Sequence, residues 1–410
     1  MMVKKEIEHE ARGNFLNNNK SNAFDVIILG AGGAGMMCAA IAGQRGRKVL
    51  LIDHANKVGK KILISGGGRC NFTNLNTLPE RFLSANPHFA KSALSRYSPQ
   101  DFIALVEKHR ITWHEKTLGQ LFCDGSAKQI VEMLLDECAK GHVELRFGQG
   151  VREVDHGDGI FRVSYGDSTA SAPALVIATG GPSIPKMGAT GFAYDLARKF
   201  GLKVVEPRPA LVPLTLGGDE TEFRSLSGVS AQVIARCGKA EFREAALFTF
   251  KGLSGPAILQ ISSYWKRGGD IGIDFLPEAK SGWLLEAKRT QPRISLRAVL
   301  AQTLPARLVD ILAERTGLAG ELANIPDARL IKAEQRLANW LFSPNGSEGF
   351  AKAEVTIGGI STKNLSSRSM EANSVAGLYA IGEAVDVTGW LGGYNFQWAW
   401  ASGWAAGQCL

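Results

Sequence analysis

Near its start, the chain alternates short apolar runs with a glycine-rich turn and a longer apolar stretch. One run, Phe24 to Leu29, precedes the glycine-rich segment 30–35, and a largely apolar stretch then continues to about Arg45. A second short run, Val49 to Ile52, ends at Asp53. Short apolar runs bounded by turn residues are typical of buried strands, and the stretch between them has the length of a helix. The pattern predicts a strand–turn–helix–strand unit.

Further along, the pattern changes twice. Helices are expected between Asn86 and Gly141, and strands at Val143–Phe147, Phe161–Tyr165 and Leu175–Ala178. From about residue 203, short apolar runs separated by Gly and Pro indicate a β-rich segment, and a helical period follows it. Buried strands ending in glycine turns return at about residue 353.

This order predicts an α/β fold in which one domain is split around an insert. The expected division is a disordered extension at 1–22, a first part of the nucleotide-binding domain at 23–202, an insert at 203–352 and a second part at 353–410. Within the insert, 203–280 is expected to be β-rich and 281–341 helical.

The segment 30–35 carries the spacing G-x-G-x-x-G between a predicted strand and a predicted helix. In that context the first glycine permits a tight turn, the second admits a pyrophosphate and the third lets the helix pack on the strand. The helix N-terminus offers unpaired N–H groups to the phosphates, and the acid after the second strand accepts a hydrogen bond from the adenosine ribose. The sequence thus predicts a dinucleotide site at Gly30, Gly32, Gly33, Ala34, Gly35 and Asp53.

A membrane span is the alternative for this stretch, because Val26 to Gly43 holds no charged residue. A span there would place a glycine loop in lipid, where each unpaired backbone group costs several kcal/mol. We therefore expect no membrane segment. Residues 1–22 are polar, without the apolar core of a signal peptide, so a cytoplasmic location is expected.

Later glycine-rich elements are expected to complete the cofactor site. The glycines of the loop 65–69 let the backbone press against a flat or anionic ligand. Glu383, which follows a predicted strand, is placed to bind ribityl hydroxyls, and a helix starting at Gly392 would direct amides at the pyrimidine edge of a flavin. The alternatives are a surface acid and a plain helix start.

FAD is expected rather than NAD, because this second, distant element is present and no second G-x-G-x-x-G exists. The further residues expected to contact the cofactor are Lys61, Ser65, Gly66, Gly67, Gly68, Arg69, Asn71, Thr179, Gly180, Gly382, Glu383, Gly392, Gly393, Tyr394 and Asn395.

The charge balance raises nucleic acid as a partner. The chain of 410 residues has a formal net charge of +8. Residues 45–69 hold seven Lys and Arg against one acid, and residues 280–336 hold ten against six. These charges fit a polyanionic substrate, but neutralisation of the cofactor's own phosphates and ordinary solvated surface charge remain alternatives.

Cysteine and histidine positions argue against metal or dithiol chemistry. The six cysteines include no C-x-x-C pair, and all seven histidines lie at or before His156. We expect no metal site and reduced thiols.

Four segments resemble the YhiN/BaiN-like flavoproteins, and most closely the proteobacterial YhiN branch. They are the loop 65–74, the segment Leu118–Asp124, the segment Gly252–Ala257 and the C-terminal block Val387–Trp400. The resemblance runs from about Phe24 to the C-terminus and is weakest at about 280–340. One departure lies at Phe250, where that family carries a histidine.

The resemblance implies a glutathione-reductase-like, Rossmann-type FAD-binding domain, interrupted by an insert with a β-barrel part and a helical part. It also implies reduction of a C=C bond conjugated to a carbonyl. The YhiN branch is linked to dihydrouridine formation in large-subunit ribosomal RNA, and another branch to unsaturated oxo-bile acids. The basic charge favours ribosomal RNA as the partner.

For this chemistry the candidate catalytic residues are Cys70, Cys123, Tyr394 and Asn395, where a thiol or the phenol donates the proton. Asn71 and Asn74 are further candidates to polarise the carbonyl. NADH or NADPH is expected as a transient reductant. Two alternatives stay open: reduction of a small conjugated enone, and a flavin-holding RNA-binding or ribosome-assembly factor without catalysis. The oligomeric state is not predicted.

Overall fold

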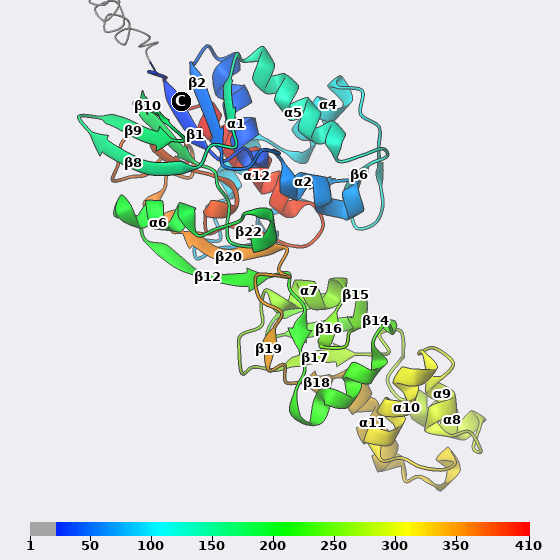
Figure 1. Cartoon of the computed structure of the whole chain (residues 1–410). Coiled ribbons are helices and arrows are strands. Elements are labelled where there is room, and N and C mark those ends of the chain that lie inside the picture. Colours follow the sequence, from blue (N-terminus) through cyan, green and yellow to red (C-terminus); the bar gives the residue numbers. More distant parts are fainter. Residues whose placement is uncertain (1–21) are drawn as a thin grey trace, which may run out of the picture.

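Five parallel strands drawn from both ends of the chain form the central sheet of the computed structural model, which describes residues 22–410 (Figure 1). In spatial order they are β21 (Leu378–Ala380), β11 (Ala174–Ile177), β1 (Val26–Leu29), β2 (Val49–Asp53) and β7 (Glu144–Phe147). Side chains along β1 are at most 1% exposed, because both faces of the sheet are covered. Apolar runs without alternation are what such doubly covered parallel strands require.

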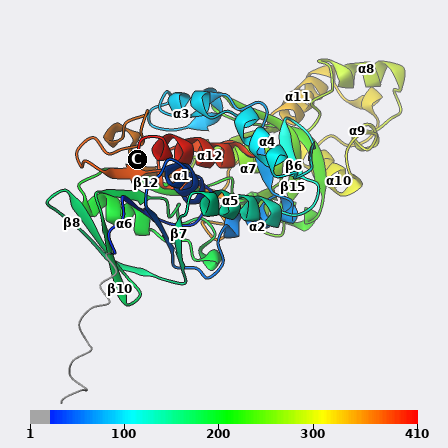
Figure 2. The ribbon, with the colours of Figure 1, turned by 90° about the horizontal axis from the view of Figure 1, so that it is seen from above.

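Helices and a meander cover this sheet. Helix α1 (Gly33–Gln44) packs between α12 (Tyr394–Gly407) and α5 (Lys128–Lys140), as Figure 2 shows from above. An antiparallel meander packs against β1 and β11. Its strands are β8 (Val151–Gly157), β9 (Ile160–Tyr165) and β10 (Ser168–Ala172). The remaining helices of this part are α2 (Lys60–Ile64), α3 (Lys91–Arg96), α4 (Pro99–Lys108) and α6 (Phe192–Lys199).

The expectation of helices throughout 86–141 is wrong for residues 113–123. There β5 (Trp113–Glu115) and β6 (Gln120–Cys123) pair as a hairpin, and β6 also pairs with β3 (Asn71–Asn74). The turn between the two strands places Leu118 at φ 53° and Gly119 at φ 78°. The helical run ends earlier, at Lys108, and Arg110 just after it has a left-handed φ of 56°. The hairpin lies beside the glycine loop 65–68, since a Cβ on Gly66 would meet the Phe122 ring at 2.7 Å.

The last helix begins two residues later than expected. Gly392 and Gly393 have φ values of 105° and 96°, which lie outside the helical region, and α12 starts at Tyr394. At these angles a side chain is strained, so the glycine pair forms the approach to the helix rather than its first turn.

The insert is joined through an antiparallel ribbon of β12 (Val204–Ala210) and β20 (Val355–Ile360). Beyond the ribbon, seven antiparallel strands form one sheet with a hydrophobic core of its own. Their order is β18 (Trp340–Phe342), β17 (Ile271–Asp274), β14 (Ser230–Cys237), β15 (Ala240–Phe248), β16 (Gly252–Ser254), β13 (Leu214–Thr215) and β19 (Gly346–Ser347).

In Figure 1 this sheet lies between the nucleotide-binding part and a helical tip. Helix α7 (Pro256–Ser262) packs on β15. The tip comprises α8 (Trp283–Thr290), α9 (Leu296–Leu300), α10 (Ala306–Thr316) and α11 (Asp327–Ala338). The short strands β4 (Phe82–Leu83) and β22 (Thr388–Gly389) pair with each other in the nucleotide-binding part.

The extension expected at 1–22 lies outside the described residues except for Asn22. That residue donates from Nδ2 to the Thr169 carbonyl at 2.8 Å, and its own carbonyl accepts from the Ser171 N–H at 2.9 Å, so it is bonded to β10. Within residues 22–410, no helix combines the length and the apolar character needed to cross a bilayer.

A buried carboxylate ties three helices together. Glu137 on α5 is 5% exposed and accepts hydrogen bonds from Gln44 at the end of α1, from Lys140 and from the His109 ring. Burial by itself raises the pKa of this carboxyl, but the hydrogen bonds and the Lys108 charge lower it to about 2.

We expect Glu137→Gln to destabilise the fold by about 2 kcal/mol near neutral pH, because it removes the charge that these partners stabilise. The pKa lies lower in the folded chain than in the unfolded one, so the stabilisation is present above the unfolded pKa and is lost as the pH falls towards 2. Denaturation curves at pH 7 and pH 3 check this, with Glu132→Gln on the exposed face of α5 as control. An equal effect of both variants at pH 7 contradicts the prediction.

Candidate active site

A cavity of about 790 Å³ opens at the carboxyl ends of the parallel strands. It extends from the ends of β1 and β2, past the turn after β11, to the start of β20 at the insert. This volume lies within the range of cofactor sites, and the carboxyl edge of such a sheet is where α/β domains bind nucleotides.

Most of the residues expected to hold the cofactor line this cavity. They are Gly30, Gly32, Gly33, Ala34, Asp53, Lys61, Ser65, Gly66, Gly67, Asn71, Thr179, Gly180, Gly382, Glu383, Gly392, Gly393 and Asn395. The others, Gly35, Gly68, Arg69 and Tyr394, lie outside its wall. A Cβ on Gly35 would stand 1.9 Å from the Gly30 carbonyl oxygen, so this glycine permits the close packing of α1 on the turn.

The turn after β1 is held open towards the cavity. Gly30 has φ 105°, and a Cβ there would meet the Ala178 carbonyl oxygen at 2.5 Å, whereas Gly32 has open space around it. No side chain caps the N-terminus of α1, so its first N–H groups are available to phosphate oxygens. Asp53 accepts from the backbone N–H of Ala31 at 2.7 Å and keeps further lone pairs for a ribose hydroxyl.

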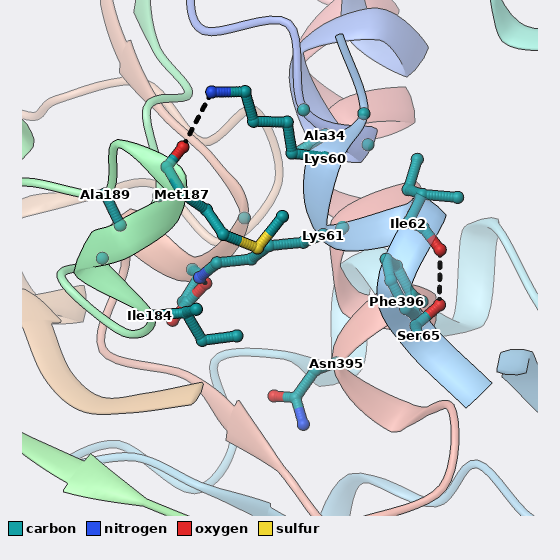
Figure 3. Close-up of a pocket in the computed structure, with 18 of the residues that line it drawn as sticks. Ala34, Lys60, Lys61, Ile62, Ser65, Ile184, Met187, Ala189, Asn395 and Phe396 are labelled. Atoms are coloured by element: carbon teal, nitrogen blue, oxygen red, sulfur yellow. Dashed lines mark hydrogen bonds and ion pairs between the residues drawn. The ribbon is translucent and has the colours of Figure 1, made fainter. Parts of the chain in front are cut away.

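A charged cluster occupies the middle of the cavity. The Lys61 ammonium donates to Glu383 Oε2 at 2.5 Å and to Ser183 Oγ at 2.6 Å. Glu383 Oε1 accepts from Ser183 Oγ at 2.7 Å and from the Thr356 N–H at 3.0 Å. Figure 3 shows Lys61 extending towards Ile184, while Lys60 donates to the Met187 carbonyl. The cluster fixes a carboxylate where the ribityl chain is expected.

The glycine pair before α12 forms the far end of the cavity. A Cβ on Gly392 would meet the Gln120 side chain at 2.8 Å, and one on Gly393 would meet the Thr73 carbonyl oxygen at 2.4 Å. Asn74 donates to the Gly392 carbonyl at 2.8 Å. The Asn395 amide pairs with both backbone groups of Gly389, so this side chain holds the approach to the helix.

These residues fit FAD. Unpaired helix N–H groups face the cavity at α1, and α12 also starts at its wall with no side-chain cap. The Thr179 hydroxyl is buried on the same wall without a hydrogen-bond partner. A buried polar group without a partner is costly, and a ligand at this wall supplies one.

The expected thiol donors lie away from the cavity. Cys70 and Cys123 are both fully buried, and neither lines the wall. Burial raises the pKa of the Cys70 thiol far above its usual range and that of Cys123 to about 12. The Tyr394 hydroxyl accepts a hydrogen bond from Arg81, and burial raises its pKa. Their role in proton transfer stays a prediction.

The tryptophans of α12 pack in the core. Trp400 is 0% exposed, donates to the Phe72 carbonyl and stacks on Phe102 at 4.4 Å. Phe250, at the position where the resembled family has histidine, is 66% exposed and lies outside the cavity wall. Among the described residues, no group of three or more His, Cys, Asp or Glu is arranged to hold a metal ion.

The polar residues of the site that were not predicted from the sequence include Ser183, which is fully buried and bonds Lys61 and Glu383, and Glu354. Ser183 follows the turn after β11, in the run Gly180-Gly181-Pro182-Ser183. This glycine–proline turn is the feature of the sequence that could have indicated it. Glu354 lines the wall just before β20, and a lone acid in front of an apolar strand marks it in the sequence.

A family model described as "HI0933-like protein Rossmann domain" matches residues 24–409. The chain is 52% identical over 398 residues to a protein of Escherichia coli named ribosomal RNA dihydrouridine synthase, covering 94% of this chain and 98% of that one. A protein of the same name from Haemophilus influenzae is 46% identical over 387 residues, with 92% and 96% covered.

A more distant relative is the protein of Clostridium scindens named 3-dehydro-bile acid delta(4,6)-reductase. It is 29% identical over 406 residues, covering 93% of this chain and 97% of that one.

We expect Gly393→Ala to lower the amount of FAD that co-purifies with the protein. The new Cβ would clash with the Thr73 carbonyl and displace the start of α12 from the cavity. Gly46→Ala is the matched control, because Gly46 has a similar φ of 88° and nothing within 4 Å of its Cβ position. The flavin-to-protein ratio from absorbance checks this, and equal loss in both variants would contradict it.

Proposed function

We propose, from the premise that the chain belongs to the HI0933-like Rossmann family, that it reduces uridine to dihydrouridine in large-subunit ribosomal RNA. Family membership makes the chain an FAD-dependent oxidoreductase. The observation that supports this substrate is the 52% identity, over nearly the whole of both chains, to a protein named ribosomal RNA dihydrouridine synthase.

The reaction saturates a C=C bond conjugated to a carbonyl. FAD, when bound and reduced, supplies the hydride for the ring carbon farther from the carbonyl. The neighbouring carbon then takes a proton. We propose NADH or NADPH as the reductant, which docks transiently because the chain carries no second G-x-G-x-x-G.

The chain's own residues bind and orient the two reactants. The uncapped N-terminus of α1 would hold the phosphates of FAD, Asp53 the adenosine ribose and the Lys61–Glu383 pair the ribityl chain. The positive N-terminal end of α12 would stabilise negative charge on the reduced ring. Asn395 keeps this end in place through its bonds to Gly389.

The charge of the chain supports an RNA substrate. Lys57 and Lys60 line the cavity, and the net charge is +8. Lysines beside the opening can neutralise backbone phosphates, which gives binding that weakens as salt rises. A uridine inside folded RNA has to be flipped out to reach the cavity, at a cost of a few kcal/mol. The same substrate places the enzyme in the cytoplasm.

A small unsaturated carbonyl compound is the second candidate. It is supported by the 29% identical relative whose name is that of a bile acid reductase. Apolar residues such as Ile184, Met187 and Leu391 also line the cavity, and they suit a small apolar ring.

Deleting the gene is expected to remove a dihydrouridine from large-subunit ribosomal RNA. The intact gene is expected to restore the modification, and the Gly393→Ala variant to restore little of it, because that variant loses FAD. Mass spectrometry of digested ribosomal RNA measures the modified nucleoside.

Unchanged dihydrouridine, together with turnover of a small enone by the purified flavoprotein, would contradict the RNA proposal and favour the second candidate. A flavin-free variant that binds ribosomal RNA and still restores the modification would contradict an FAD-dependent reaction.

A further inference from the structure

We propose that Glu354 is the general acid of this site, the residue that protonates the substrate carbon next to the carbonyl. The inference rests on the proposed function for the identity of the substrate. It does not depend on RNA, because every conjugated C=C reduction needs one proton at that carbon.

Glu354 lines the cavity where the nucleotide-binding part meets the insert, directly before β20. Its N–H donates to the Leu211 carbonyl at 3.2 Å, and Leu211 lines the same wall. The adenosine end, at Asp53, and the ribityl cluster, at Glu383, lie on other elements. Glu354 therefore lies on a part of the cavity wall that is separate from both of these groups, and we expect the substrate to bind there.

The other acids of the wall are already engaged. Asp53 accepts hydrogen bonds from two backbone N–H groups, and Glu383 is held by Lys61, Ser183 and the Thr356 N–H. Among residues 22–410, no hydrogen bond or ion pair holds the Glu354 carboxyl. It is the acid of the cavity wall whose carboxyl is free to meet a ligand.

The surroundings favour the protonated form of this carboxyl. The cluster of Ala210, Leu211 and Val355 beside it is apolar, and this burial raises the pKa of Glu354. The side chain itself stays accessible because it borders the open cavity. A carboxyl that is desolvated by protein but open to a ligand is suited to act as a general acid.

No neighbouring charge opposes this state. The charged residues of the adjoining elements are Glu206 and Arg208 on β12, Lys352 before β20, Asp195, Arg198 and Lys199 on α6, and Glu383 in the turn after β21. None of them forms an ion pair with Glu354. The cavity cations Lys60 and Lys61 are bonded to Met187 and to the Glu383 cluster.

The step balances. A hydride, with its electron pair, adds to the carbon farther from the carbonyl, and the π pair of the C=C bond moves onto the adjacent carbon. That carbon takes the proton from the Glu354 carboxyl, which is left as a carboxylate and is reprotonated from water. The reduced cofactor is the electron donor.

The test separates cofactor loading from proton transfer. Holoenzyme is reduced with dithionite under anaerobic conditions and mixed with ribosomal RNA from the deletion strain or with 2-cyclohexenone, and reoxidation of the flavin is followed. We expect Glu354→Gln to keep its FAD and its reduction by dithionite, and to slow reoxidation about 100- to 1000-fold. Glu206→Gln on β12, exposed and outside the cavity wall, is the control and should match the wild type.

The pH profile gives a second measurement. Reoxidation by the wild type should fall as the pH rises through the raised pKa of Glu354, because only the protonated form donates. Reoxidation of Glu354→Asp should be slower than that of the wild type, but its rate should still fall as the pH rises. Glu354→Gln should not show this fall.

A Glu354→Gln variant that reoxidises at the wild-type rate overturns the assignment. So does loss of FAD from that variant, which would make Glu354 a cofactor-binding residue. If the wild type is reoxidised by the enone and not by RNA, the RNA proposal fails while Glu354 is still tested on the enone.

Discussion

The close packing of α1 on α12 is the constraint on which the site depends. A Cβ on Gly403 would lie 2.5 Å from the Ala34 carbonyl oxygen, and one on Gly33 would lie 2.6 Å from the Trp400 ring. The two helices therefore approach more closely than side chains normally allow. Because α1 and α12 pack in this way, both of their N-termini reach one cavity. Two positive helix ends are thereby available to a single ligand, and we propose that one serves its phosphates and the other its ring.

This arrangement explains how the domain carries a long insert. The central sheet takes β1 and β2 from the start of the chain and β21 from its end, so the strands that carry the glycine turns do not come from the insert. The insert leaves and returns through the β12–β20 ribbon, and it has a separate core. It contributes to the cavity beside the ribbon, where Leu211 and Glu354 line the wall, and through α7, where Gln260 accepts a hydrogen bond from the Leu391 N–H at 2.9 Å.

The phosphate end of the site could be predicted from the sequence, because local backbone geometry defines it. The glycine spacing at 30–35 and Asp53 after β2 are enough to place the turn, and most of the predicted cofactor residues line the cavity. Ser183 and Glu354 could not be found in this way, since their roles come from contacts across the fold. Cys70 stands in a ligand-binding motif and yet faces the core, because a left-handed φ of 51° ends the glycine loop there.

The reaction in the cavity and the choice of substrate are determined by different residues. If Asp53, Lys61 and Glu383 hold the cofactor as proposed, the reaction depends on which substrate ring reaches the remaining wall of the cavity. Hydride addition and protonation are the same for a uracil and for an enone. Discrimination must therefore come from groups that touch the rest of the substrate. For RNA those groups are the basic residues around the opening, whose attraction to phosphates does not depend on base identity. The reacting base is then selected by which uridine can be flipped out at that place, so RNA shape as well as base chemistry sets the target.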